Sequence, residues 1–414
     1  MEVLYRRCAG IDVHSKTLAV CVRCVGEGSR VQQQVRTFGT MTRDLLALHD
    51  WLEAEGVTHV AMESTGVFWK PVYNLLEGAF QILLVNARHV KTVPGRKTDV
   101  RDCEWLAQLL QCGLLRASFI PPRPQRELRD LTRMRMQLKH ELGSVTNRIH
   151  KVLEDANIKL GVVATDILGV SGRRMIEALI AGETDVVKMA DLSCRRLREK
   201  IPQLQLALEG KVTEHHRFLL QALLDHVEYL EKQIEHFNER IETACRPFQT
   251  AITALLPIPG FDRVSAAAVI AEIGADMKPF PTHAHLCAWA KVSPGNHETG
   301  GKRKSGKTGP GNRWLRATLV QVAWAASHKK DSYFQGQYRR LAGRRGKKRA
   351  LVAVAHSVLT DVYCILKTGQ SYRELGASHL DLLQRDRIRR YHVKRLQALG
   401  YKVELVEENE GLAA

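Results

Sequence analysis

The sequence predicts a mixed α/β domain at the N-terminus, followed by mainly helical regions and a charged tail. Residues 8 to about 115 alternate β-rich runs with segments that have the apolar spacing of helices. A proline-rich break at 121–124 ends this pattern, and long apolar seams at heptad spacing follow it. We therefore expect four parts, at residues 1–120, 121–249, 250–370 and 371–414.

The N-terminal region begins with three β-rich runs, and helices and strands then alternate up to the proline-rich break. The expected elements are strands 8–13, 18–25 and 31–38, helix 42–55, strand 58–63, helix 71–77, strand 81–86 and helix 99–112. Thr98 is placed as the N-cap of the last helix. Three antiparallel strands followed by α, β, α, β, α is the order of an RNase H-like fold, which we predict here.

Two apolar seams at heptad spacing follow the α/β region. Arg135 interrupts the first seam, whereas the second continues through three heptads. Their members are Leu128, Leu131, Leu138, Leu142, Val145, Ile149 and Val152 in the first, and Leu220, Leu223, Val227, Leu230, Ile234, Phe237 and Ile241 in the second. The spacing predicts a coiled coil, formed either as a hairpin within the chain or between two copies. Of the two, we expect the dimer.

A turn rich in proline and glycine opens the third part of the chain. Residues 255–261 precede an apolar run at 264–273, and together they resemble a helix-hairpin-helix element. In that motif a tight glycine turn presents backbone N–H groups and a helix N-terminus to a phosphate. The alternative is a plain helix-turn-helix inside a mainly helical core.

The chain is strongly basic, with 62 Lys and Arg residues, 44 Asp and Glu residues and a formal net charge of +18. This surplus predicts a polyanionic partner, because Lys and Arg that neutralise phosphates release condensed counterions. The alternative is a basic protein of unrelated function. The N-terminal residues run directly into a strand pattern without the features of a signal peptide, and no apolar run approaches the ~18 residues that span a bilayer. The nine cysteines are scattered, apart from Cys21 and Cys24 in a strand-like run. We expect a cytoplasmic protein without a membrane partner.

Four acidic residues fall where an RNase H-like fold would bring them together. Asp12 lies within the first strand and Glu63 at the end of the fourth, and these two strands are neighbours in that fold. Asp99 and Asp102 are three residues apart on the last helix and share a face. Several converging carboxylates are what two Mg²⁺ ions need for phosphodiester cleavage. Solvated surface acids are the alternative, although an Asp in a buried strand costs several kcal/mol unless it is paired or metal-bound.

Two dense basic runs lie in the C-terminal third of the chain. The first, at 302–316, has six basic residues, no acid and several glycines, and the second, at 339–349, has seven basic residues. Glycines let the backbone approach phosphates, which Lys and Arg neutralise. Solvated charged loops are the alternative. The residues we expect to bind nucleic acid are Lys302, Arg303, Lys304, Lys307, Arg313, Arg316, Arg344, Arg345, Lys347 and Lys348.

Taken together, these motifs resemble those of insertion-sequence family 110, the DEDD transposases described as RNA-guided bridge recombinases. The segments 10–14, 63–66 and 97–102 look like the acidic motifs of that family. Ile258-Pro259-Gly260 and Pro294-Gly295-Asn296, with the basic stretch after them, look like its C-terminal transposase domain. The resemblance spans most of the chain, and the motifs are specific only in combination.

The resemblance implies a RuvC-like domain whose carboxylates bind Mg²⁺, a coiled-coil region and a C-terminal transposase domain with a nucleophilic serine. That serine would form a covalent link to DNA while donor and target DNA are cut and rejoined. The resemblance also implies a structured non-coding guide RNA, a homo-oligomer (dimer or tetramer) and a place at the nucleoid in a bacterial cytoplasm. Mg²⁺ as the cofactor is expected at one or two ions per active site.

One departure from the family pattern concerns the nucleophile. Family members carry serine between Glu and a small residue, whereas the matching stretch here, 298–300, holds Thr299. Threonine has the same hydroxyl group, but its extra methyl crowds an in-line attack. We expect Thr299 to be the nucleophile, with Ser305 as the alternative and a phosphate-binding hydroxyl as a third possibility. Glu298 and His297 lie next to it and could assist proton transfer, although isolated loop residues of these types are more often bystanders.

Two other functions compete with the recombinase. A hydrolytic junction-resolving nuclease would use the four carboxylates and water without a covalent intermediate. A regulator that binds DNA or RNA would have no catalytic carboxylates at all. A covalent protein–DNA adduct that survives denaturation distinguishes the recombinase from the nuclease. Loss of activity on substitution of Asp12 excludes the regulator.

Overall fold

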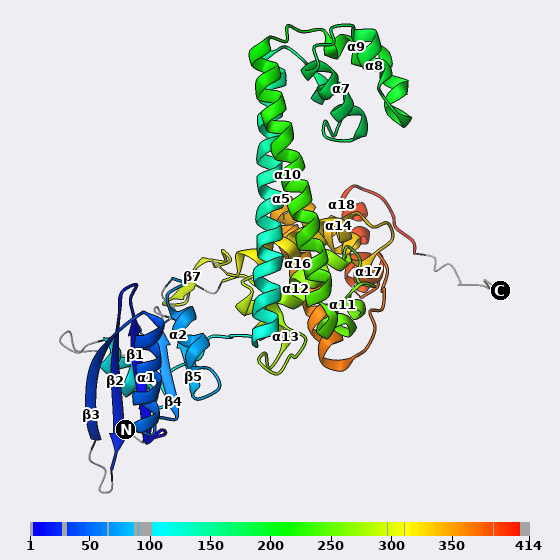
Figure 1. The fold of residues 1–414 in the computed structure, drawn as a ribbon. Helices are drawn as coiled ribbons and strands as arrows, with labels where there is room; N and C mark the ends of the chain where they lie inside the picture. The colour runs from blue at the N-terminus through cyan, green and yellow to red at the C-terminus, as the bar shows by residue number, and fades with distance from the viewer. Residues whose placement is uncertain are drawn as a thin grey trace. The chain divides into compact units, whose positions relative to one another are not determined.

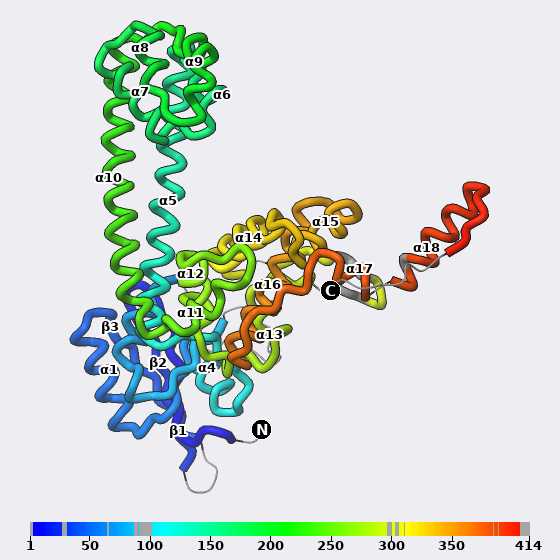
Figure 2. The backbone as a smooth tube through the Cα atoms, turned by 90° about the vertical axis from the view of Figure 1, so that its right-hand side faces the viewer, coloured from blue at the N-terminus to red at the C-terminus, as the bar shows by residue number. Residues whose placement is uncertain are grey.

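The structure of the protein is a computed structural model, which describes residues 3–26, 31–63, 66–86, 90, 102–295, 297–309, 311–383 and 385–405. The chain forms two compact units, Met1–Ile120 and Pro121–Ala414. The course of the chain within each unit can be followed by colour in Figures 1 and 2.

The first unit is built on a five-stranded sheet with the strand order β3-β2-β1-β4-β5. β1 pairs antiparallel with β2, and β2 pairs antiparallel with β3, whereas β1, β4 and β5 run parallel. The elements are β1 (Arg7–Val13), β2 (Thr17–Val25), β3 (Val31–Gly39), α1 (Thr42–Ala54), β4 (His59–Glu63), α2 (Trp69–Leu76), β5 (Gln81–Val85) and α4 (Asp102–Gln111). The prediction of a mixed α/β sheet domain is confirmed, and the element order agrees with an RNase H-like transposase domain.

The two faces of this sheet are covered by different helices, because side chains alternate along each strand. Ala9, Ile11 and Val13 of β1 pack into a core with α1 and α2. Cys8, which is out of phase with that set, packs with the apolar face of α4. The apolar alternation in β1 therefore fixes which of its residues face α4. The predicted helix at 99–112 is described from Asp102 to Gln111, and both Asp99 and the predicted N-cap Thr98 lie outside the described residues.

In the second unit, the two heptad seams lie on two long helices, α5 (Arg123–Asp155) and α10 (Glu214–Ala244), that pack against each other. The pair is antiparallel: Asp155 contacts His216, Glu141 contacts His226, and Arg135 donates a hydrogen bond to Asn238. Both figures show the two helices side by side along their length. Arg135, the polar interruption of the first seam, is thus satisfied by the opposite helix.

This packing is the hairpin within the chain, one of the two alternatives that the heptad spacing left open. Leu220, Val227 and Leu230 are buried in one core with Val145 and Ile149. Heptad spacing specifies an apolar face and not the chain that supplies its partner, and here the partner is the other helix of the same chain. The seams therefore form the hairpin within the chain.

Four short helices form a small cluster between the distal ends of α5 and α10 (Figure 2). They share one apolar core with those ends. They are α6 (Leu160–Val163), α7 (Val170–Ile180), α8 (Val186–Asp191) and α9 (Ile201–Leu208). Asp185 caps α8 by accepting bonds from the backbone N–H groups of Val187 and Lys188.

The remainder of the second unit is a helical body around α16 (Lys347–Thr368). The other elements are α11 (Gln249–Leu255), α12 (Arg263–Ile273), α13 (His283–Trp289), the strands β6 (His297–Thr299) and β7 (Lys302–Ser305), α14 (Arg313–His328), α15 (Tyr333–Arg345), α17 (His379–Leu382) and α18 (Arg385–Ala398). Among the helices of the described residues, α16 is long and apolar enough to cross a membrane. It packs against α11, α13, α14 and α15, as the core helix of a helical body does.

The predicted helix-hairpin-helix segment is formed by α11, a turn and α12. Gly260 in the turn has φ +88°, and an added Cβ would lie 2.3 Å from the carbonyl oxygen of Val322 on α14. The glycine is therefore required for close packing on α14. Asp262 caps α12 by accepting a 2.7 Å hydrogen bond from the backbone N–H of Ser265. Because this carboxylate already occupies the helix N-terminus, the structure gives no support to phosphate binding there.

Candidate active site

Asp12 and Glu63 lie next to each other at one edge of the sheet, the edge at which the central parallel strands β1 and β4 end. β1 pairs in parallel with β4, and the last pair in register is Ile11 with Met62. Asp12 and Glu63 are each the next residue of their strand, so the same register brings them alongside each other, about 5 Å apart between strand axes. Ala61, two residues before Glu63, packs against α4. Side chains two residues apart point to one face, so Glu63 faces the α4 side of the sheet.

Gly10 shows that Asp12 faces the same side. A Cβ at Gly10 would lie 2.3 Å from the carbonyl oxygen of Cys103 and 2.4 Å from the backbone nitrogen of Ala107. The helix thus crosses β1 at the position where the strand has no side chain. Asp12 is two residues further along and points to the same face.

The direction of α4 brings its first residue to the same edge. The backbone N–H groups of Leu4 and Tyr5, just before β1, donate to the carbonyl oxygen of Gln111 at the end of α4. α4 therefore runs antiparallel to β1, and its first residue, Asp102, lies at the edge where β1 ends. Three of the four predicted acids are brought to one end of one face, while Asp99 lies outside the described residues.

The surroundings of Asp12 fit a carboxylate that remains accessible. Its side chain is 21% exposed and lies 3.1 Å, between Oδ2 and Nε2, from His14. Burial raises the pKa of the neighbouring Cys103 thiol to about 11, and the charges of Glu104 and Asp12 act in the same direction. Cys103 is thus protonated at neutral pH and acts as a small apolar side chain under Asp12, next to Asp102.

The donors at this edge suit a hard divalent cation, which prefers carboxylate oxygens. Where two ions lie about 4 Å apart, their ligands spread over a larger area than those of a single ion. Among the described residues, three ligand atoms within 4.8 Å of one another occur only in a different group, His49, Asp50 and Glu53 on α1. That group lies along a solvent-facing helix surface, with Asp50 and Glu53 exposed, as acids without a metal commonly do.

Gly10 offers a test of this arrangement. Gly10→Val is expected to destabilise the first unit by about 3 kcal/mol, because the new side chain meets the backbone of α4 and cannot be relieved by rotation. Gly143→Ala is the control: Gly143 lies in α5, no atom lies within 4 Å of its added Cβ, and this change should stabilise by about 1 kcal/mol. Hydrogen exchange in β1 and α4 measures the first effect, and hydrogen exchange in α5 measures the second. Unchanged protection in Gly10→Val would contradict the close approach.

The predicted nucleophile lies in a β-hairpin that the sequence analysis did not expect. β6 pairs antiparallel with β7, so that Thr299 pairs with Lys302 and His297 with Ser305. Gly300 and Gly301, with φ of +57° and +73°, form the two-residue turn. Such a turn needs positive φ at both central residues, which glycine adopts without strain. Thr299 is therefore next to the turn, and Ser305 is at the opposite end of the hairpin.

The predicted basic residues lie on the hairpin and on three helices of the second unit. Lys302, Arg303 and Lys304 belong to β7, and Lys307 follows it. Arg313 and Arg316 are at the start of α14, where the Arg316 guanidinium donates a 3.0 Å hydrogen bond to Thr308 Oγ1. Arg344 and Arg345 end α15, while Lys347 and Lys348 begin α16, and all four are exposed. The positive end of the helix dipole repels lysines at a helix N-terminus, and an anion bound there would reduce this repulsion.

Comparisons with known proteins identify both units. Residues 9–158 match the DEDD transposase domain of the IS110 type, and residues 252–339 match the Transposase IS116/IS110/IS902 family. The chain is a transposase of the IS110 family. It is 25% identical over 323 residues to a probable family 20 transposase of Pseudomonas aeruginosa, covering 76% of this chain and 85% of the relative. It is 21% identical over 299 residues to the transposase for insertion sequence element IS1111A of Coxiella burnetii, covering 70% and 72%.

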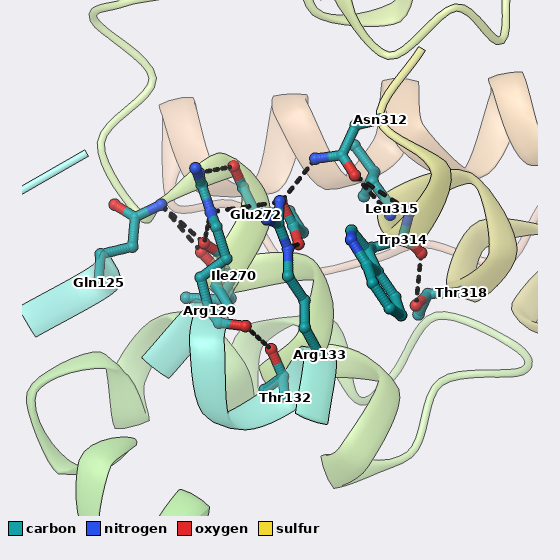
Figure 3. A network of polar contacts seen from close by, with 11 residues as sticks. Gln125, Arg129, Thr132, Arg133, Ile270, Glu272, Asn312, Trp314, Leu315 and Thr318 are labelled. Carbon is teal, nitrogen blue, oxygen red and sulfur yellow. Dashed lines mark hydrogen bonds and ion pairs between the residues drawn. The ribbon is translucent and has the colours of Figure 1, made fainter. Parts of the chain in front are cut away.

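A buried polar network in the transposase holds the chain that follows the hairpin (Figure 3). Glu272 at the end of α12 is 3% exposed, and its carboxylate accepts two hydrogen bonds from Arg133, at 2.7 and 2.9 Å. Its Oε2 also accepts a 2.5 Å hydrogen bond from the Asn312 side chain. Asn312 in turn caps α14 by accepting bonds from the backbone N–H groups of Trp314 and Leu315.

The same network supplies hydrogen-bond donors to the backbone carbonyl groups at the end of α12. The guanidinium of Arg129 donates to the backbone carbonyl oxygens of Ala271 and Glu272, at 3.1 and 2.7 Å, and Gln125 donates to the first of these at 3.1 Å. Carbonyl groups in the last turn of a helix have no partner within the helix, so α5 supplies partners for them. Asn312, the N-cap of α14 and seven positions after the hairpin, is thereby tied to α5 and α12.

Sequence reasoning did not identify Glu272, Asn312 or the hairpin. A signal was present for two of them: Gly-Gly between short runs is a hairpin signal, and Asn before a helical run is an N-cap signal. Glu272 gave none, because an acid near the end of an apolar helix normally reaches solvent. Its partners Arg129 and Arg133 lie about 140 residues away.

Proposed function

We propose that this transposase cuts and rejoins donor and target DNA, with Asp12, Glu63, Asp99 and Asp102 holding one or two Mg²⁺ ions. The observation that supports this proposal best is the edge of the sheet at which Asp12, Glu63 and the start of α4 lie together. Rigid strands and a helix packed on Gly10 would hold these carboxylates in place before the DNA arrives.

Bound at this edge, Mg²⁺ would supply Lewis-acid stabilisation of the charge that develops on the phosphate. Asp12 and Glu63 would act as ligands from the sheet, while Asp102 and Asp99 would do so from the helix. His14, 3.1 Å from Asp12, would orient that carboxylate by a hydrogen bond. Cys103 would exclude water beneath the site, because its buried thiol stays neutral.

We further propose Thr299 as the nucleophile, with Ser305 as the alternative. The Thr299 oxygen would form an ester bond to phosphorus as the bond from phosphorus to a sugar oxygen breaks. The hydroxyl proton would leave to a base, and the released sugar oxygen would take up a proton. Attack by a DNA hydroxyl on the same phosphorus would then rejoin the strands and restore the threonine.

Trapping of a protein–DNA adduct tests the nucleophile. Incubation of the transposase with labelled donor DNA, Mg²⁺ and its RNA, followed by denaturing electrophoresis, is expected to show a covalent adduct. Thr299→Ala should abolish the adduct, because the attacking oxygen is removed, whereas Ser305→Ala should retain it. Thr299→Ser, which keeps the hydroxyl and removes the methyl, should retain or increase it.

The opposite pattern, with the adduct lost only in Ser305→Ala, would move the role to Ser305. Cleavage without an adduct in any variant would instead identify a hydrolytic nuclease that uses water. A parallel reaction after ribonuclease treatment tests the proposed guide RNA, because we expect recombination to require that RNA. Full recombination after treatment would refute the RNA requirement.

The proposed partners are duplex DNA and a structured non-coding RNA, bound by the basic residues of the hairpin and of α14, α15 and α16. We also propose that the transposase works as a dimer or tetramer.

A further inference from the structure

α18 is a basic helix near the C-terminus that lies outside both segments that match transposase families. Six of its 14 residues are Arg or Lys, and Asp386 is its one acid. The basic residues are Arg385, Arg387, Arg389, Arg390, Lys394 and Arg395. All of the side chains that the structure describes in α18 are exposed, apart from that of Val393, which is half-buried.

The contacts that organise α18 include several within the helix itself. Arg389 pairs with Asp386 at 3.0 Å, Arg390 donates to the Asp386 carbonyl oxygen at 3.2 Å, and Arg395 donates to the Tyr391 hydroxyl at 2.9 Å. One acid cannot balance six cations, and like charges three or four residues apart destabilise a helix. The surface therefore favours a polyanion, which would remove this repulsion.

Three of these cations form one stripe. Arg387, Arg390 and Lys394 are spaced by three and four residues and share a helix face, and all three are exposed. Tyr391, 56% exposed, is four residues after Arg387 and borders the same face, whereas Leu396, 42% exposed, lies on the opposite side of the helix. Charge complementarity thus points to phosphates for one face of α18.

We propose that α18 enters the major groove of duplex DNA and contacts its phosphates with Arg387, Arg390 and Lys394. An α-helix with its side chains is about 10–12 Å wide, which matches the ~12 Å major groove of B-DNA. The major groove of A-form RNA is deep and narrow and does not admit such a helix. The choice of DNA as partner rests on the proposed function, whereas the fit to the major groove is argued from the helical form of α18 alone.

This surface would add to the binding by the basic residues of the hairpin and of α14, α15 and α16. Its 14 residues rise by about 1.5 Å each and span roughly 21 Å, or about six base pairs at 3.4 Å per pair. It would raise affinity for any DNA sequence through phosphate contacts, without itself taking part in strand cleavage.

The test is DNA binding by the full chain carrying Asp12→Asn, so that binding is measured without cleavage. Fluorescence anisotropy of a labelled 30-base-pair duplex is followed across a range of salt concentrations. The triple variant Arg387→Gln, Arg390→Gln, Lys394→Gln is expected to bind about 100-fold more weakly at 0.15 M salt and to lower the slope of log K against log salt by about three. The matched control replaces Arg123, Lys188 and Lys232, three exposed basic residues of other helices, by Gln and should leave both values unchanged.

A second variant separates helical docking from simple charge. Val393→Pro keeps every basic residue and breaks the helix, so it should also weaken binding to DNA. Equal losses by the triple variant on duplex DNA and duplex RNA would overturn the groove geometry, and an unchanged salt slope would overturn the DNA contact itself. Leu396→Ser tests contact with a second copy of the chain. If this variant has a lower molecular mass in light scattering, and the triple variant binds DNA with unchanged affinity, then α18 contacts a second copy and the proposal is overturned. Because cleavage is not measured, these outcomes do not depend on the proposed catalytic residues.

Discussion

Asp12→Asn is expected to lower strand cleavage by about a thousandfold or more while DNA binding persists. Bound ions contribute several kcal/mol to transition-state stabilisation, and each 1.36 kcal/mol is a factor of ten in rate. The substitution removes the charge of one carboxylate, a proposed metal ligand, at the edge shared with Glu63 and keeps the size of the side chain. Cleavage of labelled donor DNA in single-turnover reactions measures the rate, and anisotropy measures binding.

Asp50→Asn is the matched control for this prediction. Asp50 belongs to the acidic group on α1, is 79% exposed at its side chain, and belongs to the same unit. We expect full activity from this variant. A reversed result, with activity lost in Asp50→Asn and kept in Asp12→Asn, would move the metal site to α1. Activity unchanged in both would leave the protein as a regulator that binds nucleic acid.

Glu272→Ala is expected to destabilise the second unit by about 3–5 kcal/mol. The substitution leaves the guanidinium groups of Arg129 and Arg133 partly buried without their carboxylate, and it removes an acceptor of the Asn312 side chain. Burial already lowers the pKa of Arg129, and Glu272 opposes that shift. The loss of Glu272 therefore leaves the Arg129 guanidinium charge partly buried without a compensating carboxylate. Equilibrium urea unfolding, followed by circular dichroism of the helices, measures the change.

An exposed ion pair on the same helix provides the control. Arg123 and Glu127 of α5 lie 3.0 Å apart, with 77% and 63% of their side chains exposed. Glu127→Ala should change stability by less than about 1 kcal/mol, since exposed pairs are weak. A loss in Glu272→Ala no larger than that in Glu127→Ala would show that the buried network contributes little.

The sheet of the first unit could be predicted because its signal is local. Apolar residues alternate in β1 and β2, and the turns between elements carry polar residues, so the strands were located to within about two residues. The neighbouring positions of Asp12 and Glu63 followed from the order of those strands. The closeness of α4 did not follow, because it depends on the missing side chain of Gly10 and on a helix about 90 residues later.

The second unit was predicted less well because its main contacts are long-range. The heptads of α5 and α10 are visible in the sequence, but the same spacing fits a hairpin or a dimer, and the hairpin is shown by long-range pairs such as Arg135 with Asn238. The burial of Glu272 depends on arginines of another helix. The β6–β7 hairpin is short and polar, so it lacks the apolar alternation by which strands are recognised.

The paired long helices also fix a distance. The 33 residues of α5 rise by about 1.5 Å each, so the helix is roughly 50 Å long, and α10 stiffens it along most of that length. Gln125 and Arg129 fasten one end to α12, while the small cluster α6–α9 closes the other. A molecule held by that cluster would stay tens of ångströms from the helical body at a constant spacing. A flexible linker of the same number of residues would let the cluster and the helical body approach each other, whereas the rigid helix pair keeps their separation constant.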